Sequence, residues 1–140
     1  MKVIRILTVV LITLAFATIA LADEASMKKD AQNAGEQWLA MIDAGKYGES
    51  HDAAAPMFKA AVTKADWERA MNGVRNPLGN IVSRQLASAT YATTLPGAPD
   101  GKYVVVQFNT DFQNKKQAVE TLTLTLGDDS QWRSIGYFIK

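Results

Sequence analysis

The spacing of apolar residues changes once along the chain, near Pro77. In the first half, apolar and small residues recur every three or four positions, which is the spacing of one helix face. Two such sets occur: Ala31, Gly35, Trp38 and Ile42, and then Trp67, Met71, Val74 and Leu78. We therefore predict a first helix that ends at Gly45 and a last helix that begins at Thr63 and stops at Asn76-Pro77. Between them, Pro56 divides residues 47–62 into one or two short helical turns.

In the second half, apolar and polar residues alternate, as they do in strands with one buried face. The alternation is clear in residues 103–112 and 119–126, whose apolar positions are Val104, Val106, Phe108, Phe112, Leu122, Leu124 and Leu126. Residues 81–93 and 132–139 are β-branched and aromatic enough to form the first and fourth strands, and turn sequences separate all four. The predicted fold class is α+β, with N-terminal helices packed on one face of a four-stranded antiparallel meander sheet.

The first 22 residues have the pattern of a secretory signal peptide. Lys2 and Arg5 make a basic start, residues 6–19 are apolar apart from threonines, and Ala20-Leu21-Ala22 is a cleavage site of small residues. A retained membrane anchor is the alternative, but the apolar run is shorter than the roughly 20 residues that span a bilayer. We therefore expect one α+β domain over residues 23–140, periplasmic or secreted, and not attached to a membrane after cleavage.

Charge and composition exclude several kinds of chemistry. The chain has 15 basic and 14 acidic residues, and removal of Lys2 and Arg5 with the leader leaves 13 basic ones. This near-neutral balance argues against nucleic-acid binding, which depends on attraction to phosphates. The chain has no cysteine and one histidine, His51, so thiolate catalysis and two-histidine metal sites are excluded. We expect neither a metal site nor a cofactor, and we interpret His51 as a surface or helix-packing residue.

Two charged residues fall on rows of the sheet that should face inward. By strand alternation Arg84 shares a row with Val82 and Leu86, and Glu120 shares one with Leu122 and Leu124. Charges seldom stay buried unless they are paired. We therefore predict that Arg84 and Glu120 lie close enough to pair between sheet and helices, with Arg75 as a third member. They form either the polar floor of a binding pocket or an internal salt bridge that fixes the packing of sheet on helices.

Several motifs along the chain resemble those of one family. They are Gly35-Glu36-Gln37-Trp38-Leu39, Asp43-Ala44-Gly45-Lys46-Tyr47, Trp67, Arg75-Asn76-Pro77-Leu78-Gly79, Ser83-Arg84, residues 95–103, Phe108, Glu120-Thr121 and residues 132–137. Together they are similar to the exported bacterial domain of unknown function 4019 family. The resemblance implies a cystatin-like or nuclear-transport-factor-like (NTF2-like) roll. That scaffold hosts isomerases, dehydratases, inhibitors and binding modules, so it does not choose an activity.

Two hypotheses of function remain from the sequence. The first is a non-catalytic binding or interaction module of the bacterial envelope, which recognises an envelope protein or a small ligand through the concave sheet or the Pro-Gly loop at 95–102. The second is a small-molecule pocket protein, or an enzyme of the isomerase or dehydratase type, that uses Arg84 and Glu120. Because no acid/base pair with an obvious nucleophile can be assembled, we name no catalytic residue. The candidate binding residues are Arg84, Glu120 and Arg75.

Overall fold

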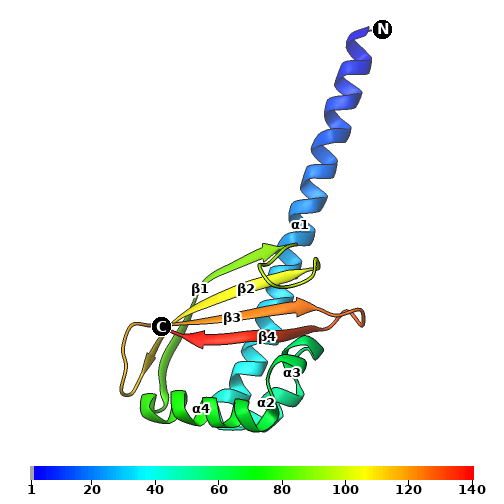
Figure 1. Ribbon diagram of the computed structural model, residues 1–140. Coiled ribbons are helices and arrows are strands. Elements are labelled where there is room, and N and C mark those ends of the chain that lie inside the picture. Colours follow the sequence, from blue (N-terminus) through cyan, green and yellow to red (C-terminus); the bar gives the residue numbers. More distant parts are fainter. Residues whose placement is uncertain (1) are drawn as a thin grey trace.

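The helices come first along the chain and the strands follow them (Figure 1). The structure is a computed structural model that describes the backbone of residues 2–140 and the side chains of residues 20–140. The helices are α1 (Lys2–Asp43), α2 (Tyr47–Asp52), α3 (Pro56–Ala61) and α4 (Lys64–Leu78), and the strands are β1 (Ile81–Ala92), β2 (Tyr103–Phe112), β3 (Ala118–Leu126) and β4 (Trp132–Ile139). The strands form one antiparallel sheet in the order β1-β2-β3-β4. The predicted α+β meander is confirmed.

The C-terminus of the first helix tests a prediction from the sequence, whereas most of its N-terminal half does not. Its C-terminus lies where expected, because Gly45 adopts φ 73° and its amide donates to the carbonyl of Ile42, which satisfies a carbonyl that the helix leaves free. Most of the predicted leader, residues 1–19, lies outside the residues whose side chains are described. Within the part of the chain that the structure describes, no helix combines the length and apolarity needed to cross a membrane.

The last helix begins as predicted but ends later. Thr63 is its N-cap, and the Thr63 hydroxyl accepts from the Asp66 amide at 3.2 Å. The expectation that Asn76-Pro77 stops this helix was wrong, because α4 runs through Pro77 to Leu78. A proline in the last turn removes only one helical hydrogen bond. Asn114, in the β2–β3 connection, caps the exposed end. Its side-chain amide donates to the Pro77 carbonyl and its backbone amide donates to the Leu78 carbonyl, each at 3.0 Å.

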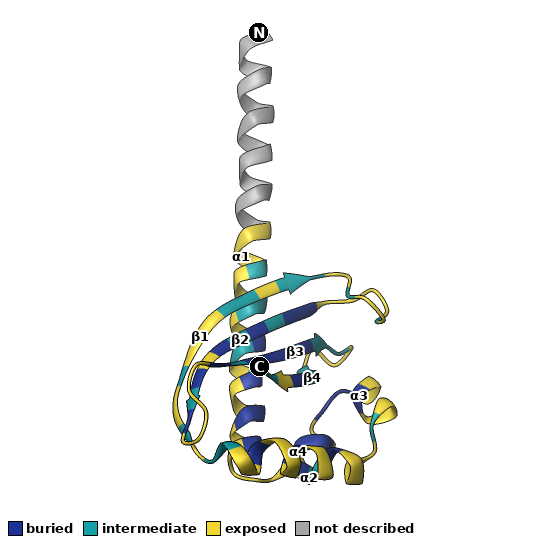
Figure 2. Ribbon diagram, turned by 60° about the vertical axis from the view of Figure 1, so that its left-hand side comes forward, coloured by how far each residue is buried: buried dark blue, intermediate teal, exposed yellow. Residues whose placement is uncertain are grey.

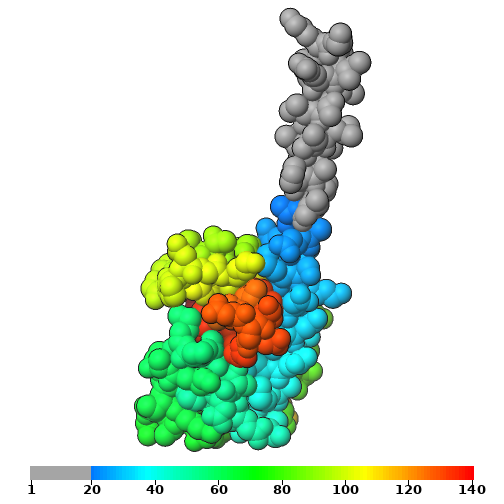
Figure 3. Space-filling model, turned by 90° about the vertical axis from the view of Figure 1, so that its right-hand side faces the viewer, coloured from blue at the N-terminus to red at the C-terminus, as the bar shows by residue number. Residues whose placement is uncertain are grey.

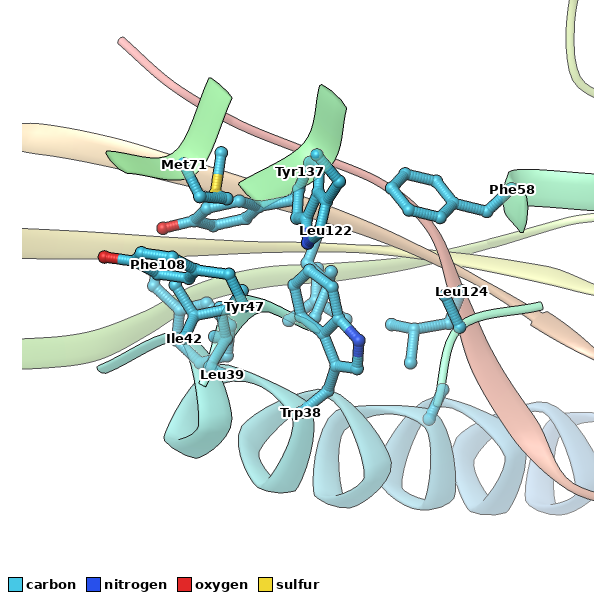
Figure 4. Close-up of a cluster of buried hydrophobic side chains, with 14 of the residues drawn as sticks. Trp38, Leu39, Ile42, Tyr47, Phe58, Met71, Phe108, Leu122, Leu124 and Tyr137 are labelled. Atoms are coloured by element: carbon cyan, nitrogen blue, oxygen red, sulfur yellow. The ribbon is translucent and has the colours of Figure 1, made fainter. Parts of the chain in front are cut away.

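The helices cover the concave face of the sheet (Figures 1 and 2). Gly35 lets α1 approach β3 closely, since a Cβ at this position would lie 2.9 Å from a methyl carbon of Leu122. Around this contact, Trp38 packs on Trp67 and Tyr137, with ring centroids 6.0 and 5.7 Å apart. Figure 4 shows Trp38 and Tyr137 among the side chains that fill the space between helices and sheet. The other core members include Leu39, Ile42, Phe58, Met71, Val104, Val106, Phe108, Leu122 and Leu124. The concave sheet face, one of the two binding surfaces that we expected, is therefore occupied by the helices.

Candidate functional site

Arg84 and Glu120 lie together between the sheet and the helices, as predicted. They belong to β1 and β3, the two neighbours of β2, and the guanidinium of Arg84 passes 6.0 Å from the ring centroid of Phe108 to reach across β2. Two Arg84 nitrogens donate to the Glu120 carboxylate, Nε at 2.6 Å and Nη2 at 3.0 Å. The geometry is the bidentate pair that makes arginine–carboxylate contacts strong.

The Glu120 carboxylate has no unused position. Its side chain is fully buried, and besides Arg84 it accepts from the Thr110 hydroxyl and the Tyr137 hydroxyl, each at 2.6 Å. Four hydrogen bonds fill the lone pairs that a carboxylate offers. Glu120 is therefore placed to hold three neighbours together, and a substrate proton would have to displace one of them.

The surroundings of Glu120 shift the pKa values of two of its hydrogen-bond partners, Tyr137 and Arg84. Burial of the Tyr137 side chain, reinforced by the charge of Glu120 and the hydrogen bond to it, raises the pKa of Tyr137 above its ordinary value of 10.0. Burial disfavours the charge on Arg84, but hydrogen bonds to Asp43 and Glu120 outweigh burial and raise the pKa of Arg84. Tyr137 therefore stays protonated and Arg84 stays charged in the folded protein at neutral pH.

Arg75 joins this group through Asp43, a residue that the sequence analysis missed. The Asp43 carboxylate accepts from Arg84 at 2.7 and 2.9 Å and from Arg75 Nη2 at 3.1 Å. Arg75 is buried, its guanidinium lies 5.1 Å from the Phe112 ring centroid, and its Nε and Nη1 have no hydrogen-bond partner among the residues with described side chains. Arg75 thus does not touch Glu120 but shares Asp43 with Arg84.

We call the six residues Asp43, Arg75, Arg84, Thr110, Glu120 and Tyr137 the ion-pair cluster. It contains two arginines and two carboxylates, so its formal charges cancel, and it ties the ends of α1 and α4 to all four strands. A network in which nearly every charge is paired and hydrogen-bonded is the arrangement that allows charges to be buried. This geometry fits a structural role better than an open reaction centre.

One premise of the Arg84 prediction was wrong. Val82 was expected to share its inward row, yet it is 66% exposed. Leu86, which pairs with the buried Phe108, stays in the row of Arg84 but is 46% exposed. The pairing of β1 with β2 shifts register between Ile81 and Ser83 and again between Leu86 and Ser88. The first of these bulges, at Val82, breaks the two-residue alternation between Val82 and Arg84, whereas no shift lies between Arg84 and Leu86.

His51 is a packing residue in α2. It is buried, its ring centroid lies 5.9 Å from that of Phe58, and its Nε2 lies 2.8 Å from the Val62 carbonyl oxygen, to which the protonated nitrogen donates. The predicted helix-packing role is confirmed. Among residues 20–140, no group of three or more His, Asp or Glu side chains is placed to hold a metal ion.

An open recess lies elsewhere, between α1 and the β3–β4 turn. Its volume is about 590 Å³, within the range of small-molecule sites. In Figure 3 the turn (orange) lies beside α1 (blue to cyan). We call this recess the α1–turn groove. The residues that line it are Met27, Asp30, Asn33, Ala34, Gln37, Trp38, Met41, Ala53, Leu126, Ser130, Gln131, Trp132, Arg133 and Ser134.

The groove was not predicted from the sequence. On its α1 side, Asp30, Asn33 and Gln37 read as a solvated helix face and the apolar residues between them read as core. Its other side comes from a turn about 100 residues later in the chain. Trp132 was the one available signal. Trp38 and Trp67 are almost fully buried and donate their indole N–H groups to Ser50, whereas Trp132 is only partly buried.

Helices on one face of a four-stranded antiparallel sheet define an α+β protein without naming an activity. The chain belongs to the family described as protein of unknown function (DUF4019), which matches residues 34–137. No curated protein matches the chain. A solved structure from Catenulispora acidiphila resembles it with a TM-score of 0.53 at 13% identity, over 84% of this chain and 93% of that one, which shows a shared fold.

Proposed function

We propose that the protein is a non-catalytic binding module whose ligand occupies the α1–turn groove. The observation that carries the proposal is the groove itself: a recess of about 590 Å³ that combines indole and thioether side chains with amides, hydroxyls and a carboxylate. Binding sites of this size usually join an apolar surface to a few polar groups that fix orientation. In contrast, the ion-pair cluster leaves no unused position on Glu120.

The enzymatic alternative needs Glu120 or Arg84 to meet a substrate. A general base must lie within hydrogen-bonding reach of the proton that it removes, and Glu120 is fully buried with its lone pairs occupied. All three side-chain nitrogens of Arg84 donate hydrogen bonds to Asp43 or Glu120. These contacts favour a structural role for Arg84, Glu120 and Arg75, and they support the binding module over the isomerase or dehydratase reading.

We also propose that the module works outside the cytoplasm, in the bacterial envelope or medium. The support is the leader pattern of residues 1–22, with its basic start and its Ala20-Leu21-Ala22 site. Cleavage after Ala22 would remove the first half of α1 and leave the residues that line the groove, the first of which is Met27. The ligand would then be a component of the envelope or of the surroundings.

Site-specific photo-crosslinking in the native cells tests the groove as the binding site. A photoreactive residue at Gln131, which is exposed at the groove, should give a defined cross-linked product. The same residue at Asn109, exposed on β2 away from the groove, is the matched control. A second variant, Gln37→Trp, should fill the groove and abolish the product at position 131. If no product forms at Gln131, or if Gln37→Trp leaves it unchanged, the proposal is wrong.

A further inference from the structure

We propose that the α1–turn groove binds a neutral glycan, an inference that rests on the proposed function and names its ligand class. The lining supplies two kinds of surface. Apolar groups come from Met27, Ala34, Trp38, Met41, Leu126 and Trp132, and uncharged hydrogen-bonding groups come from Asn33, Gln37, Ser130, Gln131 and Ser134. A sugar ring presents C–H groups on its faces and hydroxyls around its edge, so it needs both kinds at once.

The charges around the groove disfavour an anionic ligand. Arg133 is bound at both ends of its guanidinium by Asp129, with nitrogen–oxygen distances of 2.9 and 2.6 Å. The remaining charged lining residue is Asp30, which forms no salt bridge within residues 20–140. A phosphate or carboxylate in the groove would therefore meet the negative charge of Asp30 and an arginine that is already paired with Asp129.

Trp132 is the aromatic residue that is free to meet a sugar. The Trp38 ring is 4% exposed, packs on Trp67 and Tyr137, and donates its N–H to the Ser50 carbonyl at 2.8 Å. Trp132 is only partly buried and has no hydrogen bond from its indole among the described residues. Its ring offers an apolar surface for sugar C–H groups and an N–H donor for a hydroxyl.

The polar groups of the groove match hydroxyls. Each hydroxyl donates one hydrogen bond and accepts others, and the amides of Asn33, Gln37 and Gln131 both donate and accept. Ser134 is 1% exposed, and its buried hydroxyl has no hydrogen-bond partner among the residues with described side chains. A buried polar group without a partner costs free energy, and a ligand hydroxyl that reached it would recover that cost.

An extended peptide fits the groove less well. A peptide that adds a strand to a sheet needs free backbone groups along an edge. At Ser134 the edge of β4 is already engaged, because the Ser134 carbonyl accepts from the Ala55 amide at 2.9 Å. A helical peptide needs a broad apolar surface, whereas the exposed rim of this groove consists of Asp30, Asn33, Gln37, Ser130 and Gln131.

NMR titration of the three tryptophan indole N–H signals tests the glycan directly. The probes are the neutral tetrasaccharides chitotetraose, cellotetraose and maltotetraose, with tetragalacturonate as the anionic counterpart. At least one neutral probe should shift the Trp132 signal saturably at millimolar concentration and leave the Trp67 signal in place. Tetragalacturonate should bind at least about tenfold more weakly, which corresponds to about 1.4 kcal/mol.

Variants separate a sugar site from an incidental contact. Trp132→Ala should weaken binding at least about tenfold, as removal of a central aromatic contact does, and Trp132→Phe should retain part of it. Because Trp132 also packs against the core, the exposed residues Gln37→Ala and Gln131→Ala provide a second test that spares the fold, with Asn109→Ala as the control that changes nothing. If binding survives Trp132→Ala and both glutamine variants, the site assignment is wrong.

The outcomes distinguish this inference from the proposed function. A cross-link at Gln131 that Gln37→Trp abolishes, together with no response of Trp132 to any neutral tetrasaccharide, overturns the glycan and leaves the binding module standing. If the cross-linked species is a peptide or a protein, the glycan inference is likewise overturned and the binding module is retained. If neither the cross-link nor a sugar response occurs, both proposals fail.

Discussion

Glu120 is held by more neighbours than a simple salt bridge would provide. Removing both partners of an isolated buried salt bridge is often expected to be nearly neutral. The structure changes that expectation, because Thr110 and Tyr137 also donate to Glu120. Loss of the carboxylate leaves two buried hydroxyls without an acceptor, and each unpaired group costs about 1 to 3 kcal/mol.

We predict a graded series of stabilities at this cluster. Arg84→Met should lower the free energy of unfolding by about 3 to 5 kcal/mol, because it leaves the buried charge of Glu120 without its partner. Glu120→Leu should cost less, because Arg84 keeps its hydrogen bonds to Asp43 while the Thr110 and Tyr137 hydroxyls lose their acceptor. The double variant should remain destabilised by the two hydroxyls. Adding Thr110→Val and Tyr137→Phe should bring stability back to within about 2 kcal/mol of the wild type. Urea denaturation measures the series, and a quadruple variant less stable than the double one would contradict it.

Tyr137 predicts a loss of stability at alkaline pH. Its pKa is raised in the folded protein, so the stabilisation is fully present below the unfolded value near 10 and is lost as the pH rises above it. The unfolded chain then ionises while the folded protein keeps the proton, which costs up to about 1.4 kcal/mol per pH unit. Tyr137→Phe should remove this component, and Tyr91→Phe, outside the cluster, should not. Denaturation curves at pH 9 to 11 that fall equally in all three proteins would refute it.

At the scale of elements, glycines at the helix ends fix the path of the chain. Gly79 ends α4 with φ 74° and ψ −162°, a conformation that is essentially restricted to glycine. A Cβ there would also lie 2.8 Å from the side-chain oxygen of Gln113, which accepts from the Asn80 amide. The turn after α4 thus depends on both backbone freedom and space.

We predict that Gly79→Ala is more costly than Gly45→Ala. Gly45 also has a positive φ, of 73°, but nothing lies within 4 Å of a Cβ built on it. Gly45→Ala should cost about 1 kcal/mol from backbone strain alone, and Gly79→Ala about 2 to 3 kcal/mol. Thermal or urea denaturation provides the comparison. Equal losses would contradict the claim that the backbone conformation of Gly79 and its contact with Gln113 make this position more demanding.

The sequence predicted the elements well because their periodicities are strong. The alternation in β2 and β3 placed Glu120 inward correctly, and Thr63 and Gly45 marked two helix ends correctly. The end of α4 was predicted too early, at Asn76-Pro77. The local rule for prolines does not include Asn114, which caps α4 from the β2–β3 connection. Such a tertiary contact has no local signature.

The parts of the site that were missed depend on contacts across the fold. Asp43 carried a usable signal, because an acidic residue in the last turn of a helix opposes the helix dipole and therefore indicates a cationic partner. The register shift at Val82 removes this residue from the row of Arg84, and alternation alone could not reveal the shift. The α1–turn groove joins segments from opposite ends of the chain, so its polar residues read as ordinary surface. The roll-type fold name and the export signal stay predictions.

At the scale of the whole molecule, export predicts a defined N-terminus. Cleavage after Ala22 should give a mature chain that begins at Asp23. Intact-mass measurement on protein recovered from the periplasm or the medium checks this, with Ala20→Arg as a variant that should block processing. Recovery of a species that retains Met1 in membranes would contradict both the cleavage site and the proposed localisation.

The central claim is that the ion-pair cluster maintains the fold while the α1–turn groove does the binding. The most direct measurement is the photo-cross-link at position 131 in the quadruple variant with Arg84→Met, Glu120→Leu, Thr110→Val and Tyr137→Phe, once circular dichroism shows that the variant is folded. We predict the same cross-linked product in the same yield as in the parent protein. Loss of the product from a folded quadruple variant would contradict the account and return the ligand to Arg84 and Glu120.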